Sequence, residues 1–183
     1  MKRLGFVGAC LAVGQSCWIA LLVTYLVEDL RLSLTTAGML FAVMQVTGIP
    51  GRVALGFLAD RLGSGRGVLI AVAAASAATS LLLAVTSPAW PLWSVVLLMG
   101  VAGVTVSSWN GLQVAEIARN APAQRLSEAA AGATLLVFVG YVVGPAACAA
   151  LVSLTGRFDI AFVCAAAVTA FALAGLTQGT PQR

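Results

Sequence analysis

The sequence has 183 residues, of which 61% are hydrophobic and only 9% are charged, and its mean hydropathy is +1.03. Water-soluble domains carry about 25% charged residues, and disordered chains are poor in apolar residues, so both classes are excluded. The ten basic residues are scattered, which argues against nucleic-acid binding, and the chain contains no histidine. The composition is that of a membrane protein.

Charged residues divide the chain into uncharged runs that are long enough to cross a bilayer. The hydrocarbon core of a membrane needs about 20 apolar residues of helix. Strands of a membrane barrel would alternate in polarity over about 10 residues, and no such pattern is seen. We therefore expect an all-α membrane protein with six transmembrane helices, at 4–27, 32–58, 67–87, 91–115, 129–155 and 160–176.

The distribution of basic residues predicts the orientation of the chain. With six spans, both termini lie on the same side of the membrane, and basic residues gather on the cytoplasmic side. The opposite side carries only Arg31 and Arg157. We expect a multi-pass protein of the cell inner (plasma) membrane with both termini cytoplasmic, because their side holds Lys2, Arg3, Arg61, Arg66, Arg119, Arg125 and Arg183.

The four cysteines all fall within predicted spans, and neither a Cys-x-x-Cys pair nor metal-ligand spacing occurs among them. We expect them to pack as small apolar side chains. The sequence predicts no metal site and no cofactor. The cysteines are Cys10, Cys17, Cys148 and Cys164.

The loop at 56–66 joins the second span to the third and reads GFLADRLGSGR. It resembles the cytoplasmic loop signature of the major facilitator superfamily, in which a glycine, an acid, a basic residue and a second glycine precede two basic residues. Ser64 and Gly65 stand in place of that basic pair, and Arg66 comes one position late. In that family the loop stabilises the outward-facing state, and the resemblance implies the same role here. The matching positions are Gly56, Asp60, Arg61 and Gly63.

Arg52 is a charge within a predicted span, where it costs several kcal/mol unless it is paired or reaches water. It lies about six residues, or roughly 9 Å, from the cytoplasmic end of its span, so its side chain can extend to the interface. The interpretation that we favour is a gating network of Arg52 with Asp60, Glu116 and Arg119 at the inner face. Arg61 is also explained by the preference for basic residues inside.

The fifth span contains Gly140, Gly144 and Pro145 in a pattern similar to the Gly-x-x-x-Gly-Pro-x-x-Gly-Gly motif of antiporter-type members of the superfamily. Cys148 and Ala149 replace the closing glycines. The two glycines lie one turn apart and predict close helix packing, and the proline predicts a bend. A packing face without any role in transport explains the pattern equally well.

The resemblance also implies a domain organisation. Members of the superfamily have twelve spans in two halves, and each half consists of two inverted three-span repeats. Residues 1–183 are then a single six-helix half-domain with inverted repeats at 1–87 and 91–183. The chain is more similar to a C-terminal half, because it ends soon after its sixth span and its loop motif is degenerate. The expected partners are the lipid bilayer and the other six-helix half, or a second copy.

Uncharged polar and aromatic residues midway along the spans are the candidates for a substrate path, because such transporters bind their substrate near the bilayer midplane. Glutamines at this depth are explained equally well by hydrogen bonds between helices. The candidates are Gln15, Trp18, Gln45, Asn110, Gln113 and Tyr141.

The sequence therefore predicts part of a secondary active transporter that moves an unknown small molecule by alternating access. The alternative is a structural or regulatory membrane subunit without transport activity. An enzyme is not expected, because the chain has no histidine, no Gly-x-Ser-x-Gly motif and no paired acids within its spans.

Overall fold

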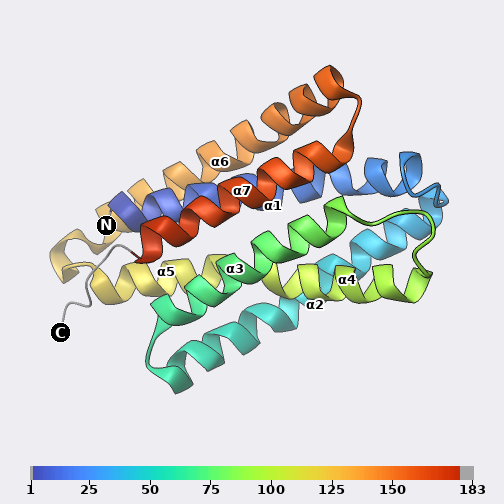
Figure 1. Cartoon of the computed structure of the whole chain (residues 1–183). Coiled ribbons are helices and arrows are strands. Elements are labelled where there is room, and N and C mark those ends of the chain that lie inside the picture. Colours follow the sequence, from blue (N-terminus) through green and yellow to red (C-terminus); the bar gives the residue numbers. More distant parts are fainter. Residues whose placement is uncertain (1, 178–183) are drawn as a thin grey trace.

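The computed structural model describes residues 2–177, and all of its regular elements are helices. Six helical stretches in this part of the chain are long and apolar enough to cross a membrane, which confirms the expected all-α fold. Arg183, one of the predicted cytoplasmic basic residues, lies outside the described residues. The elements are α1 (Lys2–Glu28), α2 (Leu34–Leu62), α3 (Gly65–Ala84), α4 (Leu92–Thr105), α5 (Trp109–Asn120), the 3-10 turn η1 (Ala123–Arg125), α6 (Leu126–Thr155) and α7 (Phe158–Thr177) (Figure 1).

The fourth span is a broken helix, where the sequence predicted a continuous one. The helix is interrupted at 106–108, between α4 and α5, and the second part continues to Asn120. Ser108 starts α5 but does not cap it, because its hydroxyl donates to the carbonyls of Gly48 at 3.0 Å and Gly103 at 2.8 Å. The break is thus held against α2.

The helices are unequally covered by one another. α1 packs mainly against α6 and α7, α3 packs against α7, and α2 packs against α4. Figure 1 shows α1, α6 and α7 together on one side of the bundle, with α2, α3 and α4 on the other. In the most apolar stretch of α1 67% of the residues are buried, compared with 22% in both α2 and α6. The faces of α2 and α6 are therefore the least covered.

The two ends of the bundle differ in charge. The start of α1, the α2–α3 and α5–α6 connections and the end of α7 lie at one end (Figure 1). The other three connections lie at the opposite end, which we call the far end. The first end is called the basic end here, because its connections and helix termini carry Arg61, Arg66, Arg119 and Arg125.

Glycines allow α1 and α6 to approach closely. A Cβ atom on Gly140 would lie 2.6 Å from the carbonyl oxygen of Ala9, and one on Gly144 would lie 3.0 Å from that of Val13. Both obstacles are backbone atoms, which have little freedom to move. The close packing predicted for this glycine pair is therefore present, and α6 continues through Pro145 to Thr155.

The same close approach corrects the interpretation of two cysteines. Cys17 of α1 and Cys148 of α6 form a disulfide, with their Cα atoms 6.1 Å apart. The expectation that all four cysteines act as simple packing residues is wrong for this pair, whereas Cys10 and Cys164 are free. The two partners are 131 residues apart in the sequence, so spacing rules could not find them.

Candidate functional site

At the basic end, Asp60 in the last turn of α2 forms an ion pair with Arg119 in the last turn of α5. The Arg119 Nη2 atom donates to Asp60 Oδ1 at 2.5 Å. Both side chains are partly exposed, at 44% for Arg119 and 72% for Asp60. The pair connects the first three spans to the last three, and two members of the predicted network are thus brought together.

The remaining residues of the loop motif shape the α2–α3 turn. Gly63 has φ 63°, a left-handed conformation that glycine adopts without strain, and it ends α2. Ser64 then accepts a hydrogen bond from the Gly67 amide at 3.0 Å and caps α3. A Cβ atom on Gly56 would meet nothing within 4 Å among the described residues. Two other glycines of α2 approach α4 closely. A Cβ atom on Gly51 would lie 3.1 Å from the Val104 Cα atom, and one on Gly48 would lie 3.2 Å from the Gly103 carbonyl oxygen.

Glu116 lies over the first residue of α3. A Cβ atom on Gly65 would be 2.5 Å from Glu116 Oε2 and 3.1 Å from Arg119 Nη1. The N-terminus of a helix carries a partial positive charge that favours a carboxylate. Asn120 also donates to Glu116 Oε1 at 3.0 Å. Glycine at position 65, where the family signature has a basic residue, therefore leaves the room that this carboxylate occupies.

Arg66 has a role that the sequence did not predict. Its Nε donates to the carbonyl of Leu176 at 2.9 Å, and its Nη2 contacts the same oxygen. This carbonyl is in the last turn of α7, where backbone oxygens lack a partner within the helix. The two residues are 110 positions apart, so no local signal identifies the contact. Arg61, by contrast, is exposed and forms no ion pair with the residues from 2 to 177.

Arg52 lies further from the end of its helix than the sequence indicated. α2 extends to Leu62, which places Arg52 ten residues, or about 15 Å, from the helix end. Its Nε donates to the carbonyl of Ser107, in the break of the fourth span, at 3.3 Å. Arg52 therefore does not join Asp60 and Arg119, since two helical turns separate Arg52 from Asp60 and its side chain points to the break.

Three of the predicted path residues meet midway along the spans, and each comes from a different helix. The Tyr141 hydroxyl on α6 donates to Gln15 Oε1 on α1 at 2.8 Å. Asn110 Nδ2, on α5, lies 3.4 Å from the same Gln15 oxygen and 3.3 Å from the Tyr141 hydroxyl. Gln15 is buried, whereas Asn110 and Tyr141 are partly exposed. We call these three residues the polar cluster.

A cavity of about 350 Å³ adjoins the polar cluster between α5 and α6. Gln113 forms part of its wall and donates to the Leu4 carbonyl at 2.9 Å, so it also ties α5 to α1. Gln45 is exposed on α2, two turns before Arg52 on the same face. No charged side chain lines the cavity among the described residues, and its wall consists of Asn110, Gln113, Val114, Ile117, Ala130, Ala133, Thr134, Val137, Phe138 and Tyr141.

Trp18 does not belong to this group. It is fully buried, its Nε1 donates to Ser80 Oγ on α3 at 2.9 Å, and its ring packs on Phe162 of α7 at 5.8 Å between centroids. Because α1 is surrounded by other helices, residues on one stripe of it can face different neighbours. The prediction that Trp18 lines the same path as Gln15 is therefore not met.

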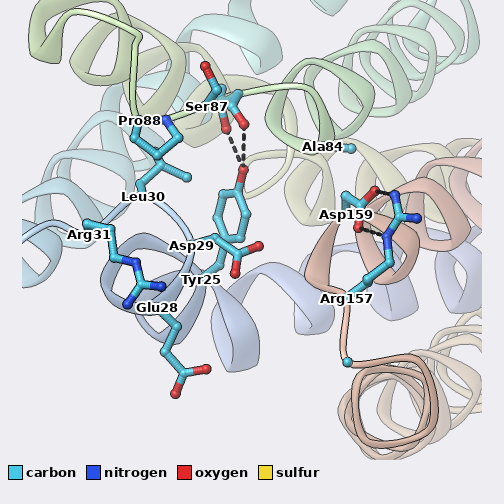
Figure 2. A pocket seen from close by; sticks show the side chains of 12 residues that line it. Tyr25, Glu28, Asp29, Leu30, Arg31, Ala84, Ser87, Pro88, Arg157 and Asp159 are labelled. Atoms are coloured by element: carbon cyan, nitrogen blue, oxygen red, sulfur yellow. Dashed lines mark hydrogen bonds and ion pairs between the residues drawn. The ribbon is translucent and has the colours of Figure 1, made fainter.

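A second cavity, of about 450 Å³, lies at the far end (Figure 2). Figure 2 shows Tyr25 pointing from α1 to the segment after α3, where its hydroxyl donates to the Thr86 carbonyl at 3.2 Å and lies 2.6 Å from the Thr86 Oγ1 atom. Arg157 pairs with Asp159, two residues further along the chain, in the wall of the cavity. Burial raises the pKa of Asp29, and the charge of Asp159 raises it further. The sequence did not single out this cavity.

Comparison with known proteins gives the family of the chain. The model of the Major Facilitator Superfamily matches residues 4–182. An uncharacterised MFS-type transporter of Mycobacterium tuberculosis strain CDC 1551 / Oshkosh is 31% identical over 115 residues, and one of strain ATCC 25618 / H37Rv is 30% identical over 115 residues. Each match covers 63% of this chain but only 26% of the relative's length. The chain is a multi-pass membrane protein that belongs to the major facilitator superfamily.

Proposed function

We propose that the chain is one six-helix half of a secondary active transporter, which moves a small molecule by alternating access. The polar cluster is the observation that carries this proposal. Three polar side chains from α1, α5 and α6 meet at mid-span depth beside a cavity, although burial of polar groups in a membrane is costly. A small molecule with hydrogen-bonding groups would bind there, against Asn110 and Tyr141.

Gating is assigned to the basic end in this proposal. The ion pair of Asp60 and Arg119 joins the first three spans to the last three, and Glu116 lies at the N-terminus of α3. An exposed ion pair is worth about 1 kcal/mol or less, so it can form in one conformation and break in another. The basic end faces the cytoplasm of the inner membrane in this proposal, with both termini on that side.

The six helices are two inverted three-span repeats in this proposal, and together they form the C-terminal half. The packing supports the repeats. If the first three spans are exchanged with the last three, the pair α1–α6 becomes the pair of the fourth span with α2, and both pairs are in close contact. The poorly covered faces of α2 and α6 are where a second half, or a second copy, would pack.

Reconstitution tests the proposal. The chain is co-expressed with a matching six-helix half, incorporated into proteoliposomes and screened for uptake of radiolabelled organic acids, amino acids and sugars. We expect uptake only when both halves are present, and a several-fold decrease for Gln15→Leu. Gln124→Leu, an exposed residue of η1, is the matched control and should leave uptake unchanged.

Two results would contradict this proposal. Equal uptake by the monomeric chain alone would refute the need for a partner half. Absence of uptake under all conditions, together with cross-linking of the chain into a larger complex, would favour a membrane subunit without transport activity.

A further inference from the structure

Arg52 is a membrane-embedded charge without an acidic partner in the described chain. It lies ten residues inside α2, whereas the other charged residues from 2 to 177 lie within a few residues of a helix end or in the connections. No carboxylate of these residues is within ion-pair distance of it. A guanidinium at this depth is costly unless an anion or water meets it. Its charge must therefore be met by an anion or by water from outside the described helices.

The guanidinium also keeps donors available for an anion. Only its Nε is engaged, with the Ser107 carbonyl at 3.3 Å, so the two terminal NH₂ groups have no protein acceptor within the part of the chain that the structure describes. Such a planar pair of donors matches a carboxylate or sulfonate. The side chain is exposed on the weakly covered α2, so a ligand has access to it.

The surroundings of Arg52 favour negative charge as well. The Ser107 carbonyl that holds it belongs to the break of the fourth span, and the 12-residue helix α5 begins at Trp109. Ser108 does not cap this helix, so the partial positive charge of its N-terminus is not offset by a side chain.

The space beside Arg52 is suited to an apolar body. The Ser107 carbonyl that accepts a hydrogen bond from Arg52 lies three residues before Asn110, which forms part of the wall of the 350 Å³ cavity. The rest of the wall is uncharged, with the Phe138 and Tyr141 rings 6.4 Å apart in an edge-to-face arrangement. A cavity of this size and lining is typical of small organic ligands.

We propose that the transported molecule is an organic anion, whose carboxylate or sulfonate is bound by Arg52 and whose apolar body occupies the cavity of α5 and α6. This inference rests on the proposed transport function and names the substrate class of the same site. The anion supplies the counter-charge that the described helices lack. A neutral molecule of the same shape would leave the guanidinium unpaired.

Binding to the full chain in nanodiscs of neutral phosphatidylcholine tests this inference, because such lipids carry no net anionic charge. The probes are radiolabelled 2-naphthoate and 2-naphthalenesulfonate, and their neutral counterparts 2-naphthamide and 2-naphthalenesulfonamide serve as competitors. We expect saturable binding of the two anions and no displacement by the neutral compounds. Arg52→Gln should weaken binding by at least about tenfold, since a charged hydrogen-bonded pair is lost.

Two further variants test whether binding depends on the positive charge at position 52 or on the total positive charge of the chain. Arg52→Lys keeps the positive charge and should retain much of the binding, although it loses the planar pair of donors. Arg125→Gln removes a basic residue from the α5–α6 connection and should bind like the unmodified chain. A circular-dichroism melt of each variant checks that its helices remain folded.

The outcomes decide between the two proposals separately. Failure of both anions to bind, equal binding of the neutral compounds, or unchanged binding by Arg52→Gln would overturn the assignment of an organic anion. Uptake of a neutral substrate by the two co-expressed halves, insensitive to Arg52→Gln, would overturn it while leaving the transport function intact. Anion binding without any uptake would support the site and contradict transport.

Discussion

The hydroxyl of Tyr141 is the centre of the polar cluster, because it contacts both Gln15 and Asn110. Tyr141→Phe should lower the free energy of unfolding by about 0.5–1.5 kcal/mol, the usual net value of a neutral hydrogen bond. SDS titration in bicelles measures this change. Thr177→Val, which removes an exposed hydroxyl bonded only within its own helix, should change stability by less than about 0.5 kcal/mol. If Tyr141→Phe loses no more stability than Thr177→Val, the Tyr141 hydroxyl does not stabilise the fold.

Asp29 lies in the connection after α1, and it predicts a pH effect of definite sign. Burial raises its pKa in the folded state, as do the charges of Asp159 and Glu28, whereas Arg31 lowers it. Protonation of Asp29 therefore favours the folded state, and its contribution to stability is lost as the pH rises through the raised pKa.

Asp29→Asn should consequently increase the thermal midpoint at pH 7.5 more than at pH 4. The increase should be no more than about 1 °C, because the side chain is largely exposed and solvent screens its charge. Differential scanning fluorimetry at the two pH values makes the comparison. A larger increase in the thermal midpoint at pH 4 than at pH 7.5 would show that the folded state does not raise the pKa of Asp29.

Individual residues also show what the sequence could predict. Asp60 and Arg119 were expected to lie near each other, because both end their spans on the same side of the membrane. Arg66 and Cys17 find partners more than 100 residues away, and these contacts depend on how the helices are packed rather than on any local pattern. The distance of Arg52 from the end of its helix is longer than expected, because α2 continues past the charged residues after Leu58 to Leu62.

At the scale of whole helices, the close packing of α1 against α6 depends on the absence of a side chain at Gly140. Gly140→Ala places a Cβ atom 2.6 Å from the Ala9 carbonyl oxygen, so the two helices must separate. We expect a destabilisation of about 1–3 kcal/mol from this overpacking. Unfolding in detergent, followed by circular dichroism, measures it.

Gly132 provides the matched control for Gly140 on the same helix. A Cβ atom at Gly132 would meet nothing within 4 Å. Gly132→Ala should therefore leave the fold intact and stabilise α6 by up to about 1 kcal/mol through helix propensity. If both variants lose similar amounts of stability, the α1–α6 contact is not the cause of the destabilisation by Gly140→Ala.

Helices were predicted well as elements and poorly in their irregularities. Six spans follow directly from the lengths of the apolar runs, which are a local property. The break at 106–108 is different, because it is held by hydrogen bonds of Ser108 to carbonyls that include Gly48, on another helix. The burial of Trp18 likewise depends on α3 and α7, which contact it through Ser80 and Phe162.

The orientation of the whole molecule can be tested by cysteine labelling in cells. Two variants each introduce one cysteine. Ala89→Cys places it in the α3–α4 connection at the far end, and Gln124→Cys places it in η1 at the basic end. A maleimide that cannot cross membranes should label Ala89→Cys in intact cells and Gln124→Cys only after permeabilisation. This result is expected because basic residues stay on the cytoplasmic side. The reverse pattern would invert the proposed topology and remove gating from the cytoplasmic face.

The uncovered position of Arg52 has a consequence for the membrane itself. A solitary copy of these six helices would expose a guanidinium about 15 Å from the helix end to acyl chains. Phosphate headgroups and water would be drawn inward to solvate it, which produces a dimple of thinned bilayer beside α2. Assembly with a second six-helix body would flatten this dimple, so the elastic energy of the lipid itself would favour pairing.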